Sequence, residues 1–197
     1  YSFTLLPPEK KKLNKDVIVD FCPINQSFEK QIFDSASVNN RSYADALRRW
    51  RSEFDGDIGL YSYYRKYAWR SAPNVFPHYI QKDMQWYASL PLQGISTYAE
   101  PGDWYTYELN HYILAMMAWD PQAGIDEACV SFFKHRYGNS WKQAQNAYAT
   151  LEAISPVFGS IPFTSLKSAD SIKHAAARVE KDLSIIDEIA NNETDAT

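Results

Sequence analysis

Cysteine is scarce in this chain. Its two cysteines, Cys22 and Cys129, lie far apart in the sequence, and two distant thiols support neither a disulfide framework nor a zinc site. Cys129 falls within a helical apolar pattern, which predicts a small buried side chain. The 4 histidines have no ligand spacing with one another, so the sequence predicts no metal site.

Glycine-rich motifs are also missing, because the 7 glycines are scattered. The sequence contains no phosphate-binding loop, no nucleophile elbow and no Cys/His dyad. It therefore gives no support to phosphoryl transfer or serine-type hydrolysis, and we expect no cofactor.

Long apolar runs and concentrated positive charge are absent as well. No run approaches the roughly 18–20 apolar residues that cross a bilayer, so we expect no membrane span. The formal net charge is −4, and the basic residues are spread out apart from Lys10, Lys11 and Lys12. Because this triplet follows two prolines, it is typical of a solvated loop, and we expect no nucleic-acid partner.

Aromatic side chains are what the sequence has in excess: 14 Tyr, 6 Trp and 10 Phe. Large rings dominate burial energetics, so many of them must lie in the core. Tyrosine outnumbers phenylalanine, however, and each phenol hydroxyl needs water or a hydrogen-bond partner. We therefore expect many of these rings to keep an edge in contact with solvent.

Short β-like runs alternate with helical patterns, which predicts an α/β fold with a parallel sheet. Ser42 suits the N-cap of a helix over residues 43–54, and Pro77 suits the first turn of a helix over residues 77–90. The β-like runs are residues 1–5, 17–22, 58–64 and 94–100.

The later β-like runs each have one apolar face and one polar or aromatic face. In the third run, Ile58 and Leu60 alternate with Tyr61 and Tyr63. Strands of a doubly wound sheet are more often apolar on both faces, whereas a barrel strand turns one face to the helices and one to the interior. The pattern favours the C-terminal half of a TIM-type β/α barrel, about strands 5–8, and we expect the N-terminal half to precede Tyr1.

Beyond Glu100 the pattern is helical. We expect Gly138 to be an αL C-cap and Ser155-Pro156 to close a helix. The predicted domains are the barrel half at residues 1–121, a trailing α-helical region at 122–191 and a frayed tail at 192–197. The predicted helices cover residues 105–119, 125–137, 140–154 and 168–190.

The candidate site lies where the β-like runs end. Parallel β/α enzymes keep their chemistry at the carboxyl ends of strands, where Tyr63, Tyr98 and Glu100 fall, with Trp104 just beyond. An aromatic ring stacks on the CH face of a sugar while a carboxylate binds its hydroxyls. We expect these four residues to bind a saccharide, with Asp20 as a further contact.

Other roles for these residues stay open. The rings could merely fill the rim of a barrel, and Glu100 could cap a loop or act as a general acid. Asp20 could form a buried ion pair with Arg65 or Arg70 instead of binding a ligand. A loop tryptophan such as Trp104 commonly packs into the core and has no part in ligand binding.

Several short segments, taken in order, carry a family pattern. They are residues 17–23, 40–42, 60–63, the helix at Pro77, Gly94 followed by 108–110, and, most clearly, 114–121 (LAMMAWDP) leading to 132–138 (FFKHRYG). Their order and spacing resemble a large bacterial family, domain of unknown function 4838, which overlaps glycoside hydrolase family 163. The resemblance covers roughly residues 1–150.

The resemblance implies a TIM-type barrel related to hexosaminidase barrels, with endo-β-N-acetylglucosaminidase-like activity on complex N-glycans. There the substrate's 2-acetamido group acts as the nucleophile, oriented by one carboxylate while a neighbouring carboxylate serves as general acid, unlike the usual two-carboxylate scheme. That acidic pair belongs to a strand end upstream of Tyr1, so no residue here inherits the catalytic role. Asp20, Tyr63, Tyr98, Glu100 and Trp104 would supply the other half of the sugar pocket.

We therefore expect part of a glycoside hydrolase for N-acetylglucosamine-containing glycans, with the glycan and the other barrel half as partners. One rival is a non-catalytic carbohydrate-binding barrel, and another is a glycosidase that uses Glu100 as its general acid. We expect a periplasmic, cell-surface or secreted bacterial protein, although no signal is visible in this chain.

Overall fold

The computed structural model describes residues 4–69 and 73–159, and the single positions 173, 177, 180 and 184. The first part alternates strands and helices: β1 (Val19–Phe21), α1 (Val38–Glu53), β2 (Ile58–Ser62), the 3-10 helix η2 (Tyr67–Trp69), α2 (Pro77–Ala88) and β3 (Gly94–Thr97). Helices follow: η3 (Pro101–Tyr107), α3 (Glu108–Trp119), α4 (Ile125–Tyr137), η4 (Gly138–Ser140) and α5 (Trp141–Gly159). The predicted mixed α/β fold is confirmed.

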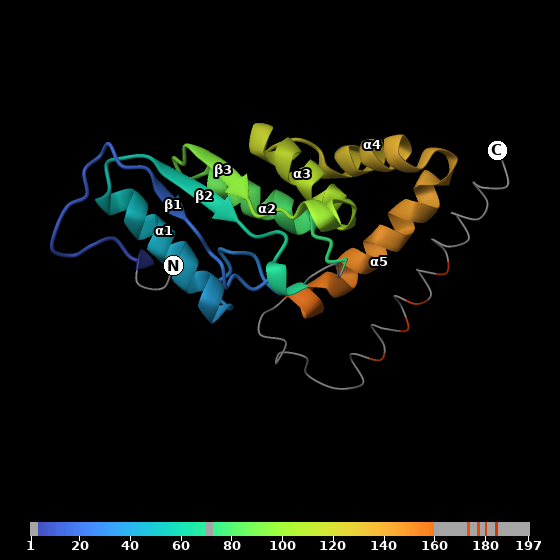
Figure 1. Cartoon of the computed structure of the whole chain (residues 1–197), viewed down its shortest axis with the longest axis horizontal. Helices are drawn as coiled ribbons and strands as arrows, with labels where there is room; N and C mark the ends of the chain where they lie inside the picture. Colours follow the sequence, from blue (N-terminus) through green and yellow to red (C-terminus); the bar gives the residue numbers. More distant parts are fainter. Residues whose placement is uncertain are drawn as a thin grey trace.

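The three strands form one parallel sheet in the order β1-β2-β3. Val19 pairs with Ile58, and Gly59 pairs with Gly94. Figure 1 shows the three arrows side by side, with the sheet and α1 at one end of the molecule and α4 and α5 at the other. Because the strands are parallel, their carboxyl ends lie at the same edge of the sheet.

The two faces of the sheet differ as the alternation predicts. Ile58 and Leu60 are buried in the core together with Phe21. On the opposite face Asp20 is exposed, and its Oδ1 lies 2.6 Å from the position that a Cβ at Gly59 would occupy. The core continues over the helices that follow each strand, where it includes Leu47, Trp50, Ile80, Met84 and Ile113.

Helix α1 begins earlier than the sequence predicts. Its N-cap is Ser37, whose hydroxyl accepts a hydrogen bond from the Asn40 backbone N–H. Ser42, the predicted cap, lies inside the helix and donates its hydroxyl to the Asn39 carbonyl. Asn40 is a poor helix former, but it is buried and holds the preceding loop, and this tertiary role overrides its local preference.

Helices α2 and α4 form where the sequence predicts them, but the cap conformation after α4 and the end of α5 differ from expectation. Gly138 has a positive φ of 50° with ψ −123°, so it is a left-handed cap residue outside the αL region. Helix α5 continues through Pro156 rather than ending at Ser155. The Ser155 hydroxyl accepts a hydrogen bond from the Val75 backbone and donates one to Leu151 O, which fixes this stretch against the loop before α2.

Some predicted elements fall outside the described residues. They include residues 1–3 of the first β-like run, most of the helix predicted at 168–190, and the tail at 192–197. Thr4 and Leu5 do not belong to a strand. In the part of the chain that is described, no helix is long and apolar enough to cross a membrane.

Candidate functional site

A pocket of about 490 Å³ lies at the carboxyl ends of the strands, and we call it the tyrosine pocket. Each strand contributes to its wall. The lining residues are Ile24 and Asn25 after β1, Tyr61, Tyr63, Lys66, Tyr67 and Ala68 from the end of β2 onward, and Tyr98 after β3. Open α/β sheets place ligand sites at this edge.

Strand geometry explains why three tyrosine rings lie close together in this pocket. Tyr61 and Tyr63 are two positions apart, so they share one side of β2 and its extension; their rings meet edge to face at 5.1 Å. The Tyr98 backbone N–H donates to Ser62 O at 3.0 Å, which prolongs the ladder beyond β3. This places the Tyr98 ring 6.5 Å from that of Tyr63.

Tyr98 also orders the nearest carboxylate. Its hydroxyl donates a hydrogen bond to Glu100 Oε1, and both side chains are half-buried. This bond raises the pKa of the Tyr98 phenol above its usual value, because ionisation would place two negative charges together. Glu100 is thus held beside the tyrosine pocket as an acceptor, with further lone pairs for a ligand.

A buried ion pair fixes the segment that follows. Arg65 Nε donates to Asp103 Oδ2 at 3.0 Å, and Nη2 donates to the same oxygen. The guanidinium also lies over the rings of Tyr98 and Tyr107, at 5.1 and 5.9 Å from their centroids. Arg65 therefore pairs with Asp103 and not with Asp20, while Arg70 lies outside the described residues.

Lys66 places a positive charge under the tyrosine pocket. Its Nζ donates to Gln26 O at 2.8 Å and lies 5.0 Å from the centroid of the Phe28 ring. Burial lowers the pKa of this ammonium to about 8. The lysine ties the segment after β2 to the loop after β1.

Buried polar groups hold the loop after β1. Asn40 donates its amide N–H groups to carbonyls of this loop, among them Lys30 O at 2.6 Å. Asp83, fully buried on α2, accepts from Gln26 Nε2 at 2.7 Å and from Ile32 N at 3.1 Å. Burial raises the pKa of Asp83 to about 7, although these bonds favour its ionised form. The pocket wall is therefore pre-organised.

The sequence-predicted site residues fall into two places. Tyr63 and Tyr98 line the tyrosine pocket, and Glu100 is attached to it through Tyr98. Asp20 is exposed on the same sheet face but is not among the lining residues. Trp104 lines a separate groove with residues of α3 and α4. The 3-10 turns of η3 carry it there, because they rotate successive side chains by about a third of a turn.

The sequence pattern left Asp103 open as an acid, a sugar contact or a loop cap, and it did not indicate that Asp103 pairs with Arg65 or that Lys66 lines the pocket. Arg65 and Asp103 are buried ionisable residues, and their partners lie far along the sequence. The one signal in the sequence was that Arg65 and Lys66 are charged residues that follow closely after a predicted strand. Because a single sequence does not give the pairing, only the structure identifies these roles.

Two other chemistries find no support in the described residues. No group of three His, Cys, Asp or Glu side chains there could hold a metal ion. Burial, followed by the neighbouring Asp20, raises the pKa of the Cys22 thiol, which disfavours a nucleophilic thiolate.

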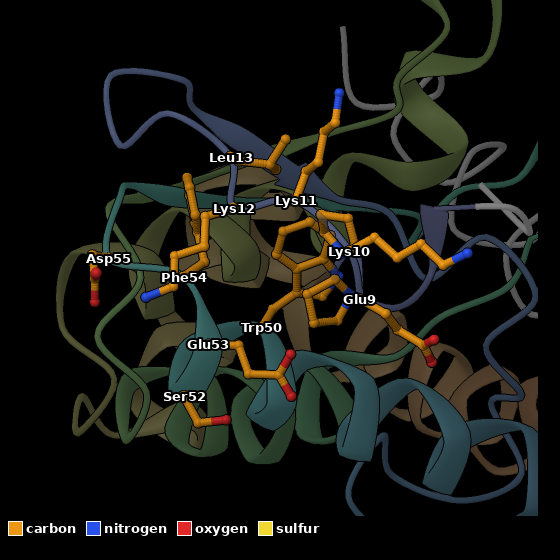
Figure 2. A pocket seen from close by; sticks show the side chains of 12 residues that line it. Glu9, Lys10, Lys11, Lys12, Leu13, Trp50, Ser52, Glu53, Phe54 and Asp55 are labelled. Atoms are coloured by element: carbon orange, nitrogen blue, oxygen red, sulfur yellow. The ribbon is translucent and has the colours of Figure 1, made fainter.

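The lysine triplet lies at a different cavity of about 380 Å³, beside Trp50 and Phe54. Figure 2 shows Lys10, Lys11 and Lys12 extending in different directions rather than converging on one point. All three are exposed, as expected of a solvated loop. The arrangement lacks the convergent donors of a phosphate site.

Comparison with known proteins identifies a family. A family model described as "Domain of unknown function (DUF4838)" matches residues 1–149. No curated protein and no solved structure matched the chain. The matched range includes β1 to β3 and every residue that lines the tyrosine pocket.

Proposed function

This chain belongs to the domain of unknown function 4838 family, and we propose that it forms the sugar-binding part of a glycoside hydrolase. Its substrates are glycans that contain N-acetylglucosamine. The observation that carries the proposal is the convergence of residues from three parallel strand ends on one tyrosine-lined pocket beside an ordered carboxylate.

The pocket offers the groups that a pyranose requires. Tyr61 and Tyr98 are half-buried and offer ring surface to the CH groups of the sugar, while the mostly buried Tyr63 forms part of the same wall. Their hydroxyls, together with the Glu100 carboxylate, exchange hydrogen bonds with sugar hydroxyls or with the acetamido N–H. A mostly apolar wall with a few placed polar groups is the usual form of a small-ligand site.

We propose that the sheet is part of a TIM-type barrel whose other strands complete the site. The open face of β1 to β3, with Asp20 and Tyr61, would then turn toward the barrel interior. The acids of a substrate-assisted mechanism would lie on those other strands, with the substrate's acetamido group as nucleophile. A location in the periplasm, at the cell surface or outside a bacterial cell fits such substrates.

Kinetics of the full-length protein on a complex N-glycan test the proposal, with released glycan measured by mass spectrometry. Glu100→Gln keeps the shape of Glu100 but weakens its acceptance of hydrogen bonds. We expect KM to rise while kcat changes by less than about threefold, since Glu100 binds substrate equally in the ground and transition states.

Two outcomes would contradict this assignment. If Glu100 were the general acid, Glu100→Gln would lower kcat by about 10²–10⁴ with little change in KM. If the protein were a non-catalytic carbohydrate-binding barrel, the wild type would bind the glycan and release no product. Glu53→Gln is a matched control, because Glu53 is exposed on α1 and is not among the residues that line the tyrosine pocket, so this variant should keep the wild-type KM and kcat.

A further inference from the structure

A second aromatic concavity lies beside η3, between residues of α3 and α4, and we call it the tryptophan groove. Its volume is about 540 Å³. Trp104 keeps 46% of its surface exposed at the wall of this groove, although so large a ring is normally buried. The lining residues are Trp104, Glu108, His111, Tyr112, Ala115, Ser131, Phe132, His135 and Arg136.

The plane of Trp104 is fixed by a neighbouring ring that also lines the groove. The His111 imidazole stacks on the indole with centroids 4.7 Å apart and an interplanar angle of 19°. Burial lowers the pKa of His111 below its usual value, so the imidazole is neutral at neutral pH and the stack needs no counter-ion. A side chain held in place before binding loses little conformational entropy when a ligand stacks on it.

Polar groups with defined directions border this ring. Arg136 Nε donates to Glu108 Oε2 at 3.1 Å, which leaves further guanidinium donors and carboxylate lone pairs for a ligand. His135 Nδ1 lies 2.7 Å from Ser131 O. Since a carbonyl only accepts, Nδ1 carries the proton, and in the neutral ring Nε2 is an acceptor.

We propose that the tryptophan groove is a second saccharide subsite, in which a pyranose ring stacks on Trp104 and its hydroxyls bond to the Glu108, His135 and Arg136 side chains. This inference rests on the proposed function, because it assigns the groove to another branch of the same glycan. An indole platform bordered by both donors and acceptors matches a sugar, with its CH face and ring of hydroxyls. An apolar peptide would leave the remaining donors and lone pairs of these groups without partners.

A short series of residue contacts connects the tyrosine pocket to the tryptophan groove. The Tyr98 ring lies under the Arg65 guanidinium, Arg65 pairs with Asp103, and Asp103 directly precedes Trp104. A branched glycan that reaches both subsites would make two linked contacts, which raise its affinity above that of a short ligand.

The test is calorimetric binding to the full-length protein with two probes. One is N,N′-diacetylchitobiose; the other is a biantennary complex N-glycan whose core linkage is a non-hydrolysable thioglycoside. We expect Trp104→Ala to weaken binding of the biantennary glycan about five- to tenfold and that of the disaccharide less than about twofold. Trp104→Phe, which keeps an aromatic face, should retain most of the affinity.

Trp119→Ala is the matched control, because Trp119 is 92% exposed and is not among the residues of either subsite. It should bind both probes as the wild type does. If Trp104→Ala binds the biantennary glycan like the wild type while Tyr98→Ala loses affinity, the second subsite is overturned and the proposed function stands. If the wild type binds neither probe, both proposals are overturned.

Discussion

The guanidinium of Arg65 and the carboxylate of Asp103 form a buried ion pair that joins the end of β2 to η3. Arg65 also lies over Tyr98, so the pair positions one wall of the tyrosine pocket. Arg65 Nη1 is buried without a hydrogen-bond partner in the described residues. Loss of Asp103 would therefore leave a buried cation with no compensating charge.

We predict that Asp103→Ala lowers the free energy of unfolding by about 3–5 kcal/mol, the usual effect of removing one partner of a buried pair. Urea denaturation at pH 7 measures this. The control is Asp45→Ala, which removes the exposed pair between Asp45 and Arg48 and should cost less than about 1 kcal/mol. Equal losses in the two variants would show that the Arg65–Asp103 pair has no special role.

Asp83 should make the free energy of unfolding depend on pH, in the range between the pKa of its carboxyl in the unfolded chain and that in the folded protein. The carboxyl has a usual pKa of 3.8, and burial raises it to about 7 in the folded protein. Between these values the folded state binds one more proton, so the free energy of unfolding falls by about 1.4 kcal/mol for each pH unit of rise.

Urea denaturation at several pH values from 4.5 to 8 tests this, with Asp83→Asn as the comparison. The variant has no titrating group at this position, and we expect a flatter dependence below pH 7. Its absolute stability should also be lower, because an amide N–H would face the donors Gln26 and Tyr64. Parallel profiles in both proteins would rule out Asp83 as the source.

His78 joins α2 to the later helices as a cation. Its Nδ1 lies 2.8 Å from Glu152 and its Nε2 lies 3.3 Å from Asp126. The hydrogen bond to Glu152, against the opposing effect of burial, raises the pKa of His78 to about 9. The stabilisation is therefore complete below pH 6.5 and is lost as pH rises through about 9.

An NMR titration of the His78 ring protons measures this pKa directly. We expect a midpoint well above 6.5 in the wild type and a larger downward shift in Glu152→Gln than in Asp126→Asn, because the Glu152 contact is shorter. A wild-type midpoint near 6.5 would show that these contacts do not form in solution.

Local patterns predicted much of the fold, because side chains return to the same face every 2 residues in a strand and every 3.6 residues in a helix. The alternation of Ile58 and Leu60 with Tyr61 identified both faces of β2. Pro77 marked the start of α2. The predicted start of α1 was wrong, because Asn40 is held in the helix by contacts with a loop that precedes it.

The site was predictable only where it follows from strand order. Tyr63 and Tyr98 meet because both lie at the ends of adjacent parallel strands. Trp104 left that group because η3 intervenes, and its stack on His111 depends on how η3 packs on α3. Pairings such as Arg65 with Asp103 depend on the folded chain and have no local signature.

A crystal structure of the full-length protein with N,N′-diacetylchitobiose tests the central claim most directly. The account predicts a sugar ring in the tyrosine pocket, in contact with the Tyr63 and Tyr98 rings and donating a hydrogen bond to the Glu100 carboxylate. A disaccharide bound only at a site remote from these residues, with the tyrosine pocket empty at saturating sugar, would contradict it.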